Sequence, residues 1–232
     1  MQWTECPDRA ALVDAVSQRI AVRLSAALEA GPEACIALAG GGTPMPIYAR
    51  LAGLDLDWAR VVAVATDERW VAADHPASNA SQIRRQFAGT GLRVAGLVPE
   101  QAGGEASAEL AEQTLARLGD IFDLALVGMG GDGHFASLFP HAPALATGLD
   151  PEAIESALVV MPDPLPPEAP FARVTLTLAR LLASRSLMLV ITGEAKYKVL
   201  RQALQPDADP HSLPIAALLH SAGDRLEIFW SP

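Results

Sequence analysis

Phe122 to Pro140 reads FDLALVGMGGDGHFASLFP and contains the clearest structural signal in the chain. An apolar run from Phe122 to Val127, interrupted only by Asp123, leads into four glycines that enclose Asp132 and precede His134. Such a run bounded by glycine is typical of a buried strand in a mostly parallel sheet. Ligands of open α/β sheets bind beyond the carboxyl ends of the strands. We therefore expect a carboxylate and an imidazole to be placed there for chemistry.

Apolar periodicity predicts the other elements. An apolar residue every four positions, from Leu12 to Leu28, predicts a long amphipathic helix at the N-terminus. Buried or alternating strands are expected over 35–39, 61–65, 173–177, 186–191 and 226–230, and helices over 45–51, 78–87, 103–118, 194 onward and 214–219. Strands and helices alternate without a repeat or a clear linker. This order predicts an α/β fold with a single doubly wound, mostly parallel sheet flanked by helices, in one domain over residues 1–232.

The composition restricts the possible partners. The formal charge is −10, from 17 Lys and Arg against 27 Asp and Glu, and general nucleic-acid binding needs a basic surface instead. Cys6 and Cys35 lack the spacing of a zinc site. Glu5 and Asp8 do not fit a signal peptide, and no apolar run approaches the roughly 20 residues of a membrane span. We expect a cytoplasmic monomer or weak homodimer that holds no metal and contacts no membrane.

A second glycine-rich turn follows the strand at 35–39. Gly40 to Pro44 reads GGGTP and precedes a predicted helix. Glycines let a backbone approach a phosphate closely, and a helix N-terminus supplies free N–H groups. The turn lacks the Gly-Lys-Ser/Thr of a Walker A loop. An anion site and an ordinary connection that binds nothing are equally compatible with this pattern.

Thr66 to Trp70 reads TDERW and ends the strand predicted at 61–65. If strand geometry persists, alternation points Asp67 and Arg69 to one side and Glu68 to the other. These charges are either part of a site or a structural ion pair that closes the sheet edge. The nine residues from Pro162 to Pro170 include five prolines, which predicts a rigid extended loop that serves as a lid, a linker or inert surface.

Gly128-Met-Gly-Gly-Asp-Gly133 matches the dinucleotide fingerprint GxGxxG. That fingerprint requires a helix that opens on the third glycine, whereas here Pro140 and Pro143 interrupt the continuation. The acidic residue should also end a second strand, and Asp150 has no strand before it. We exclude NAD binding on these grounds and expect no cofactor.

Five separated segments together resemble the 6-phosphogluconolactonases, which share a superfamily with the glucosamine-6-phosphate deaminases. They are AGGGTP at 39–44, TDERWV with SN at 66–71 and 78–79, VGMGGDGHFASLFP at 127–140, RVTLTL at 173–178 and TGEAK at 192–196. After His134 the deaminases continue toward an Asn-Glu-Pro ending, whereas ASLFP is similar to the lactonase form. Ala39 and Gly42 depart from the family, which often has serines there, and Ala179-Arg180 replaces a frequent proline.

The resemblance implies hydrolysis of 6-phospho-D-glucono-1,5-lactone to 6-phosphogluconate, the second step of the oxidative pentose phosphate pathway. Because a lactone is an activated ester, the reaction needs only a water, a base and charge stabilisation. His134 suits the role of the base, and Asp132 can orient either the imidazole or the water. Arg69 or the N–H groups of the glycine run can stabilise the oxyanion, and Asp67 can hold Arg69 in place. The resemblance places the phosphate against five residues: Gly41, Gly42, Thr43, Arg173 and Lys196.

Alternatives remain for several residues and for the function. His134 can instead cap a turn, Arg173 can pair with a carboxylate, and Lys198 can replace Lys196 as the phosphate ligand. The other histidines have no supporting residues around them. A glucosamine-6-phosphate deaminase/isomerase and a non-catalytic sugar-phosphate sensor are the competing functions; the segment after His134 counts against the first, and the presence of both Asp132 and His134 against the second.

Overall fold

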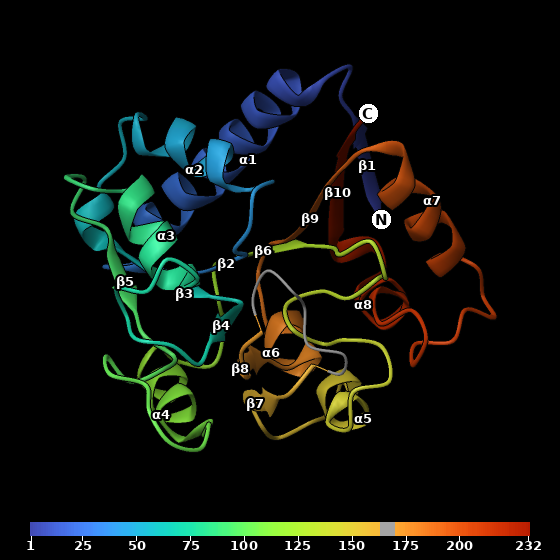
Figure 1. Ribbon diagram of the computed structural model, residues 1–232. Coiled ribbons are helices and arrows are strands. Elements are labelled where there is room, and N and C mark those ends of the chain that lie inside the picture. The colour runs from blue at the N-terminus through green and yellow to red at the C-terminus, as the bar shows by residue number, and fades with distance from the viewer. Residues whose placement is uncertain (163–169) are drawn as a thin grey trace.

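The computed structural model describes residues 1–162 and 170–232 (Figure 1). The strands are β1 (Gln2–Glu5), β2 (Ala34–Leu38), β3 (Val61–Ala65), β4 (Asp67–Arg69), β5 (Arg93–Ala95), β6 (Leu124–Gly128), β7 (Ala157–Val160), β8 (Arg173–Leu176), β9 (Leu187–Thr192) and β10 (Leu226–Ser231). The helices are α1 (Arg9–Ala30), α2 (Met45–Ala52), α3 (Asn79–Gln86), α4 (Glu109–Arg117), α5 (Leu145–Leu149), α6 (Leu178–Leu182), α7 (Glu194–Ala203) and α8 (Ile215–Ala222), with 3-10 turns at Trp58–Arg60 and Gly223–Arg225.

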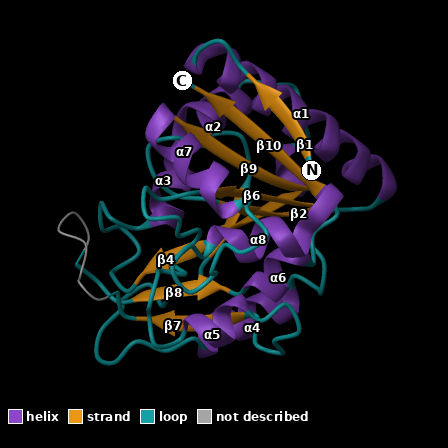
Figure 2. Cartoon of the chain, turned by 90° about the vertical axis from the view of Figure 1, so that its right-hand side faces the viewer, coloured by secondary structure: helices purple, strands orange, loops and turns teal. Residues whose placement is uncertain are grey.

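A seven-stranded parallel sheet forms the centre of the molecule, in the order β1-β10-β9-β6-β2-β3-β5. Figure 2 shows this sheet between layers of helices. Its central strands are buried along their whole length, since every residue of β2 and of β3 is buried. Such strands are expected where helices cover both faces. The mostly parallel, helix-flanked sheet predicted from the sequence is therefore confirmed.

Strand alternation divides the interior into two hydrophobic cores. Ile36 and Leu38 of β2 pack with the buried stripe of α1 and with α2 and α3, whereas Cys35 and Ala37 pack on the other face with α4, α6, α7 and α8. Successive residues of a strand point to opposite faces, which produces this division. Leu12, Val16, Ile20 and Leu24 of α1 are buried, as their spacing predicts.

A second, three-stranded sheet was not predicted. It has the antiparallel order β4-β8-β7 and lies beside the large sheet (Figure 2). Thr66 connects the two sheets, because its N–H donates to Leu38 O at 3.0 Å and its carbonyl accepts from Leu176 N at 2.9 Å. The prediction of a single sheet was wrong here: the chain leaves the large sheet after β3, and Asp67–Arg69 pairs with β8 instead.

Some boundaries also differ from the predictions. Gln2–Glu5 forms an edge strand that pairs with β10 before the N-terminal helix begins. The helix predicted over 103–118 is confined to Glu109–Arg117. The glycine run after β6 leads into a loop, and the next helix starts only at Leu145, which agrees with the argument against a dinucleotide fingerprint. Residues 163–169 of the proline-rich segment lie outside the described residues.

No helix in residues 1–162 and 170–232 combines the length and the apolar character that crossing a bilayer requires. The longest, α1, has 22 residues and carries charged side chains along its exposed face.

Candidate active site

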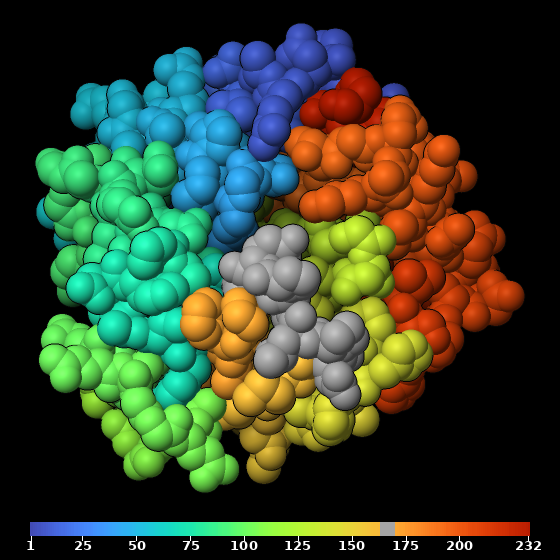
Figure 3. Space-filling view, in the orientation of Figure 1, coloured from blue at the N-terminus to red at the C-terminus, as the bar shows by residue number. Residues whose placement is uncertain are grey.

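A pocket of about 330 Å³ opens at the carboxyl ends of β2, β3 and β6. The predicted site residues that line it are Gly41, Gly42, Thr43, Asp67, Arg69, His134, Arg173 and Lys196. On the surface in Figure 3, segments near residues 40–50 (blue), 130–140 (yellow-green) and 190–200 (orange) meet on one face. Asp132 is not among the residues that line this pocket, but it contacts His134, which does. The structure thus brings together segments that are far apart in the sequence.

His134 and Asp132 form a hydrogen-bonded pair. Asp132 Oδ1 lies 2.6 Å from Nδ1 of His134 and also accepts from the His134 backbone N–H at 3.2 Å. Burial by itself would raise the pKa of Asp132, but the hydrogen bonds and the charge of His134 outweigh it and lower that pKa. Because Asp132 therefore stays ionised while an imidazole titrates, it can hold the ring with Nδ1 as donor. That leaves Nε2 as the ring nitrogen available for proton transfer.

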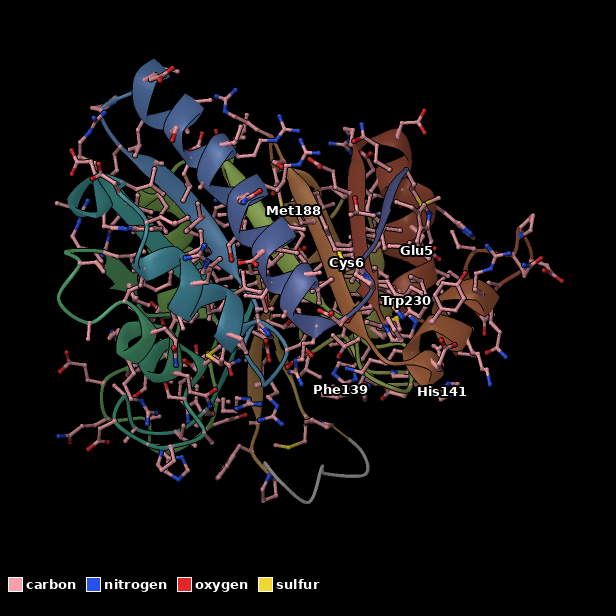
Figure 4. All side chains as sticks on the ribbon, turned by 90° about the horizontal axis from the view of Figure 1, so that it is seen from above. Glu5, Cys6, Phe139, His141, Met188 and Trp230 are labelled. Atoms are coloured by element: carbon pink, nitrogen blue, oxygen red, sulfur yellow. The ribbon has the colours of Figure 1, made fainter. Side chains whose placement is uncertain are left out.

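Phe139 supports the imidazole from a second direction. Its ring centroid lies 4.4 Å from that of His134, and both side chains line the pocket. In Figure 4, Phe139 and His141 lie toward the same edge of the molecule, away from Met188 in the sheet. An aromatic face favours a neighbouring cation, so this contact suits a ring that gains a proton during a reaction.

Arg69 and Arg173 face each other across the small sheet. They are register partners on antiparallel β4 and β8, and both line the pocket. Burial, and next the positive charge of Arg69, lower the pKa of Arg173, which is only 3% exposed. Like charges directly opposite each other destabilise a sheet. An anion in the pocket would relieve this repulsion.

Lys196 brings a third positive charge to the pocket. It lies in the first turn of α7, where a cation is unfavourable because the helix dipole is positive there. Burial lowers the pKa of Lys196, and the charge of Asp132 opposes that effect. Lys196 lines the pocket, whereas Lys198 is not among the described residues that line it. The geometry favours Lys196 as the residue that meets a ligand.

The glycine turn supplies backbone donors to the same pocket. Within the described residues, the amides of Gly41, Gly42 and Thr43 donate to no protein acceptor. Gly41 has a φ of 92°, which favours glycine, and Gly42 O accepts a hydrogen bond from Arg9 at 3.1 Å. A side chain at Gly42 would meet no atom within 4 Å. Free amides before a helix suit an anion.

Glu68 points away from the pocket, as strand alternation predicts. Its carboxylate accepts hydrogen bonds from the backbone N–H groups of Arg69, Asn79 and Ala80 and from the Ser78 hydroxyl. Burial raises the pKa of Glu68, and these hydrogen bonds counteract the rise. Glu68 therefore anchors the start of α3, where the helix has free N–H groups. Among the described residues it forms no ion pair at the sheet edge.

Asp67 binds two residues that the sequence did not single out for the site. Asn79 Nδ2 donates to Asp67 Oδ1 at 3.3 Å and to its backbone carbonyl at 2.7 Å. Ser137 Oγ donates to Asp67 Oδ2 at 2.5 Å. The Arg69 guanidinium donates to Ala77 O, and no Asp67–Arg69 ion pair occurs in the described part of the chain. Asp67 thus contacts a different set of residues from the one expected.

Comparisons with known proteins agree with this geometry. A sequence model described as Glucosamine-6-phosphate isomerases/6-phosphogluconolactonase matches residues 7–230. A 6-phosphogluconolactonase of Pseudomonas putida is 37% identical over 98% of this chain and 92% of its own length. One from Pseudomonas aeruginosa is 34% identical, over 94% of this chain and 89% of its own.

Solved structures give the same result. A 6-phosphogluconolactonase from Shewanella baltica superposes with a TM-score of 0.89 at 32% identity, over 100% of this chain and 98% of that chain. One from Thermotoga maritima has a TM-score of 0.81 at 28% identity, over 99% of this chain and 98% of that chain. The resemblance found in the five sequence segments is therefore confirmed, and the chain belongs to the glucosamine-6-phosphate isomerase/6-phosphogluconolactonase family.

Proposed function

We propose that this protein is a lactonase that hydrolyses 6-phospho-D-glucono-1,5-lactone to 6-phospho-D-gluconate. The observation that carries the proposal is the pairing of His134 with Asp132 at the edge of a pocket whose other walls hold Arg69, Arg173 and Lys196. A base next to a cluster of cations suits an anionic ester. The relatives named 6-phosphogluconolactonase, aligned over nearly the whole chain, support the same substrate.

In the proposed reaction His134 acts as a general base. Nε2 takes a proton from a water as the water oxygen attacks the lactone carbonyl carbon, and the carbonyl oxygen becomes an oxyanion. The tetrahedral intermediate then collapses, the bond to the ring oxygen breaks, and the imidazolium returns the proton to that oxygen. Asp132 keeps the ring oriented throughout. The product is the open-chain acid, which ionises.

The charged walls have separate roles in this proposal. Arg69, or N–H groups of the glycine run, stabilises the oxyanion, an effect worth roughly 3 kcal/mol per donor. Arg173 and Lys196 bind the phosphate together with the free amides of Gly41, Gly42 and Thr43. Arg69 and Arg173 are cross-strand partners. The cation that stabilises the oxyanion and the cation that binds the phosphate are therefore neighbours in this proposal.

Initial hydrolysis rates test the function. Freshly generated 6-phosphogluconolactone is assayed at slightly acidic pH, which restrains its spontaneous opening, and unphosphorylated gluconolactone serves as the control substrate. We expect acceleration over buffer with a strong preference for the phosphorylated lactone. No acceleration would exclude the lactonase. Ammonia release from glucosamine 6-phosphate would indicate the deaminase instead, and binding without turnover would indicate a sensor.

The proposed phosphate role of Lys196 predicts an alkaline limit to product binding. Burial lowers the pKa of Lys196, so its proton leaves at a lower pH than that of an ordinary lysine and the positive charge is lost as pH rises. The affinity for 6-phosphogluconate should therefore fall as pH rises, at a lower pH than the pKa of about 10.4 of an ordinary lysine, while the phosphate stays dianionic. Calorimetric titration of wild type and Lys196→Arg measures this, and the arginine variant should keep its affinity.

Lys198→Arg provides the matched control, because Lys198 is two residues away on the same helix and outside the pocket lining. Its affinity should follow the wild-type dependence on pH. If wild type and Lys196→Arg lose affinity in parallel, Lys196 does not contact the phosphate.

A further inference from the structure

Ser137 connects the loop that carries His134 to the small sheet. It lies three residues after His134, and its side chain is 1% exposed. Its hydroxyl donates to Asp67 Oδ2 at 2.5 Å, and its backbone N–H donates to Thr175 Oγ1 at 3.0 Å. Asp67 and Thr175 are themselves register partners on β4 and β8. Both donors of Ser137 therefore bind the sheet that presents Arg69 and Arg173.

The backbone next to Ser137 has an unfavourable conformation. Ala136 has a φ of 48°, a region that residues with a Cβ rarely occupy. It lies in a tight turn in which Leu138 N donates to Phe135 O at 3.0 Å. Such a conformation persists only where the surroundings enforce it, and it is found preferentially at functional sites. The two hydrogen bonds from Ser137 are contacts that enforce it here.

Asn79 holds Asp67 from the other side. Its Nδ2 donates to both the carbonyl and the carboxylate of Asp67, and because these groups only accept, the orientation of the amide is determined. Its Oδ1 then faces Gly40, where a Cβ would lie 2.0 Å away. Asn79, which is 1% exposed, thus packs between the glycine turn and β4.

We propose that Ser137 and Asn79 are positioning residues that act through Asp67. Ser137 sets the distance between the base, His134, and the oxyanion-stabilising Arg69. Asn79 holds β4 in place against the glycine turn. The inference rests on the proposed lactonase function. Ser137 and Asn79 both line the pocket, but Ser137 is only 1% exposed and its hydroxyl is engaged by Asp67, so we assign it a positioning role and not that of a nucleophile.

Steady-state kinetics of Ser137→Ala test the proposal. The residues that bind the phosphate are unchanged, so KM and the affinity for 6-phosphogluconate should stay within about twofold of wild type. The base and the oxyanion site lose their relative placement, so kcat should fall about 10- to 100-fold. Ser137→Thr keeps the hydroxyl and should recover most of the rate. Asn79→Ala should also lower kcat, and because Asn79 packs against the glycine turn that binds the phosphate, it should raise KM as well.

A double-mutant cycle separates this role from a general loss of structure. If Ser137 acts through Asp67, adding Ser137→Ala to Asp67→Ala should slow the enzyme little further. Ser17→Ala is the matched control: Ser17 is equally buried at 1% and donates to Val13 O at 2.6 Å and to Ile47 O at 3.4 Å, and none of these three residues lines the pocket. Its kinetics should equal those of wild type, and thermal melts of all variants verify folding.

Three results would overturn the inference. The first is an undiminished kcat in Ser137→Ala when the wild type is active. The second is that Ser137→Ala lowers kcat in the Asp67→Ala background as much as it does in the wild type. The third is a covalent substrate adduct on Ser137 detected by mass spectrometry. A wild type that fails to accelerate the reaction would instead refute the lactonase function, and the positioning role with it.

Discussion

His134→Ala is expected to lose nearly all lactonase activity while the fold survives. A positioned general base contributes about 10²- to 10⁴-fold to a rate, and kcat should fall by an amount in that range. The side chain is 28% exposed and its polar contact is with Asp132, so its removal leaves no buried group without a partner. Initial rates on fresh 6-phosphogluconolactone give the effect, and circular dichroism verifies the fold.

His220→Ala is the control for this variant. His220 is an exposed histidine in the last turn of α8, and its replacement should change neither rate nor fold. A wild-type rate in His134→Ala would end the proposed base role. The pocket would then have to activate water by another group.

Gly130→Ala is expected to reduce kcat about 100-fold, although Gly130 takes no part in the proton transfer. A Cβ at this position would lie 2.2 Å from both Cε1 and Nδ1 of His134 and 2.6 Å from Asp132 Oδ1. Gly130 is not among the glycines with positive φ, so the backbone accepts alanine and the imidazole must move instead. A displacement of about 1 Å can cost about 10²-fold in rate.

Gly131→Ala separates this effect from a general intolerance of the glycine run. A Cβ at Gly131 would meet nothing within 4 Å, so its kcat should stay near that of wild type. Steady-state kinetics and thermal melts of both variants make the comparison. Equal kcat values in the two variants would mean that the observed placement of the His134 ring is unimportant for the rate.

Much of the large sheet could be predicted from local pattern. The buried runs at β2, β3 and β9 and the four-residue spacing of α1 reflect burial on a strand or on one helix face, and each pattern lies within a single segment. The nearness of His134 to Asp132 is equally local, since a single residue, Gly133, lies between them in the loop. Their assignment to one chemical unit therefore needed no tertiary information.

Two of the strands that were missed, β1 and β4, depend on distant partners. β1 is a strand because it pairs with β10 at the other end of the sequence. β4 belongs to the small sheet because it pairs with β8, more than 100 residues later. Neither segment has enough residues for a periodic signal of its own. Tertiary pairing therefore decided the secondary structure at both places.

The sequence by itself determined the parallel α/β sheet, the Asp132–His134 pair and the family, because these follow from local patterns and ordered motifs. The tertiary structure alone decided that Arg69 and Arg173 are neighbours, that Lys196 rather than Lys198 lines the pocket, and that Asp67 binds Ser137 and Asn79. Ser137 and Asp67 are separated by 70 residues. Such contacts depend on how separate elements pack, and no local pattern encodes the packing of two distant segments.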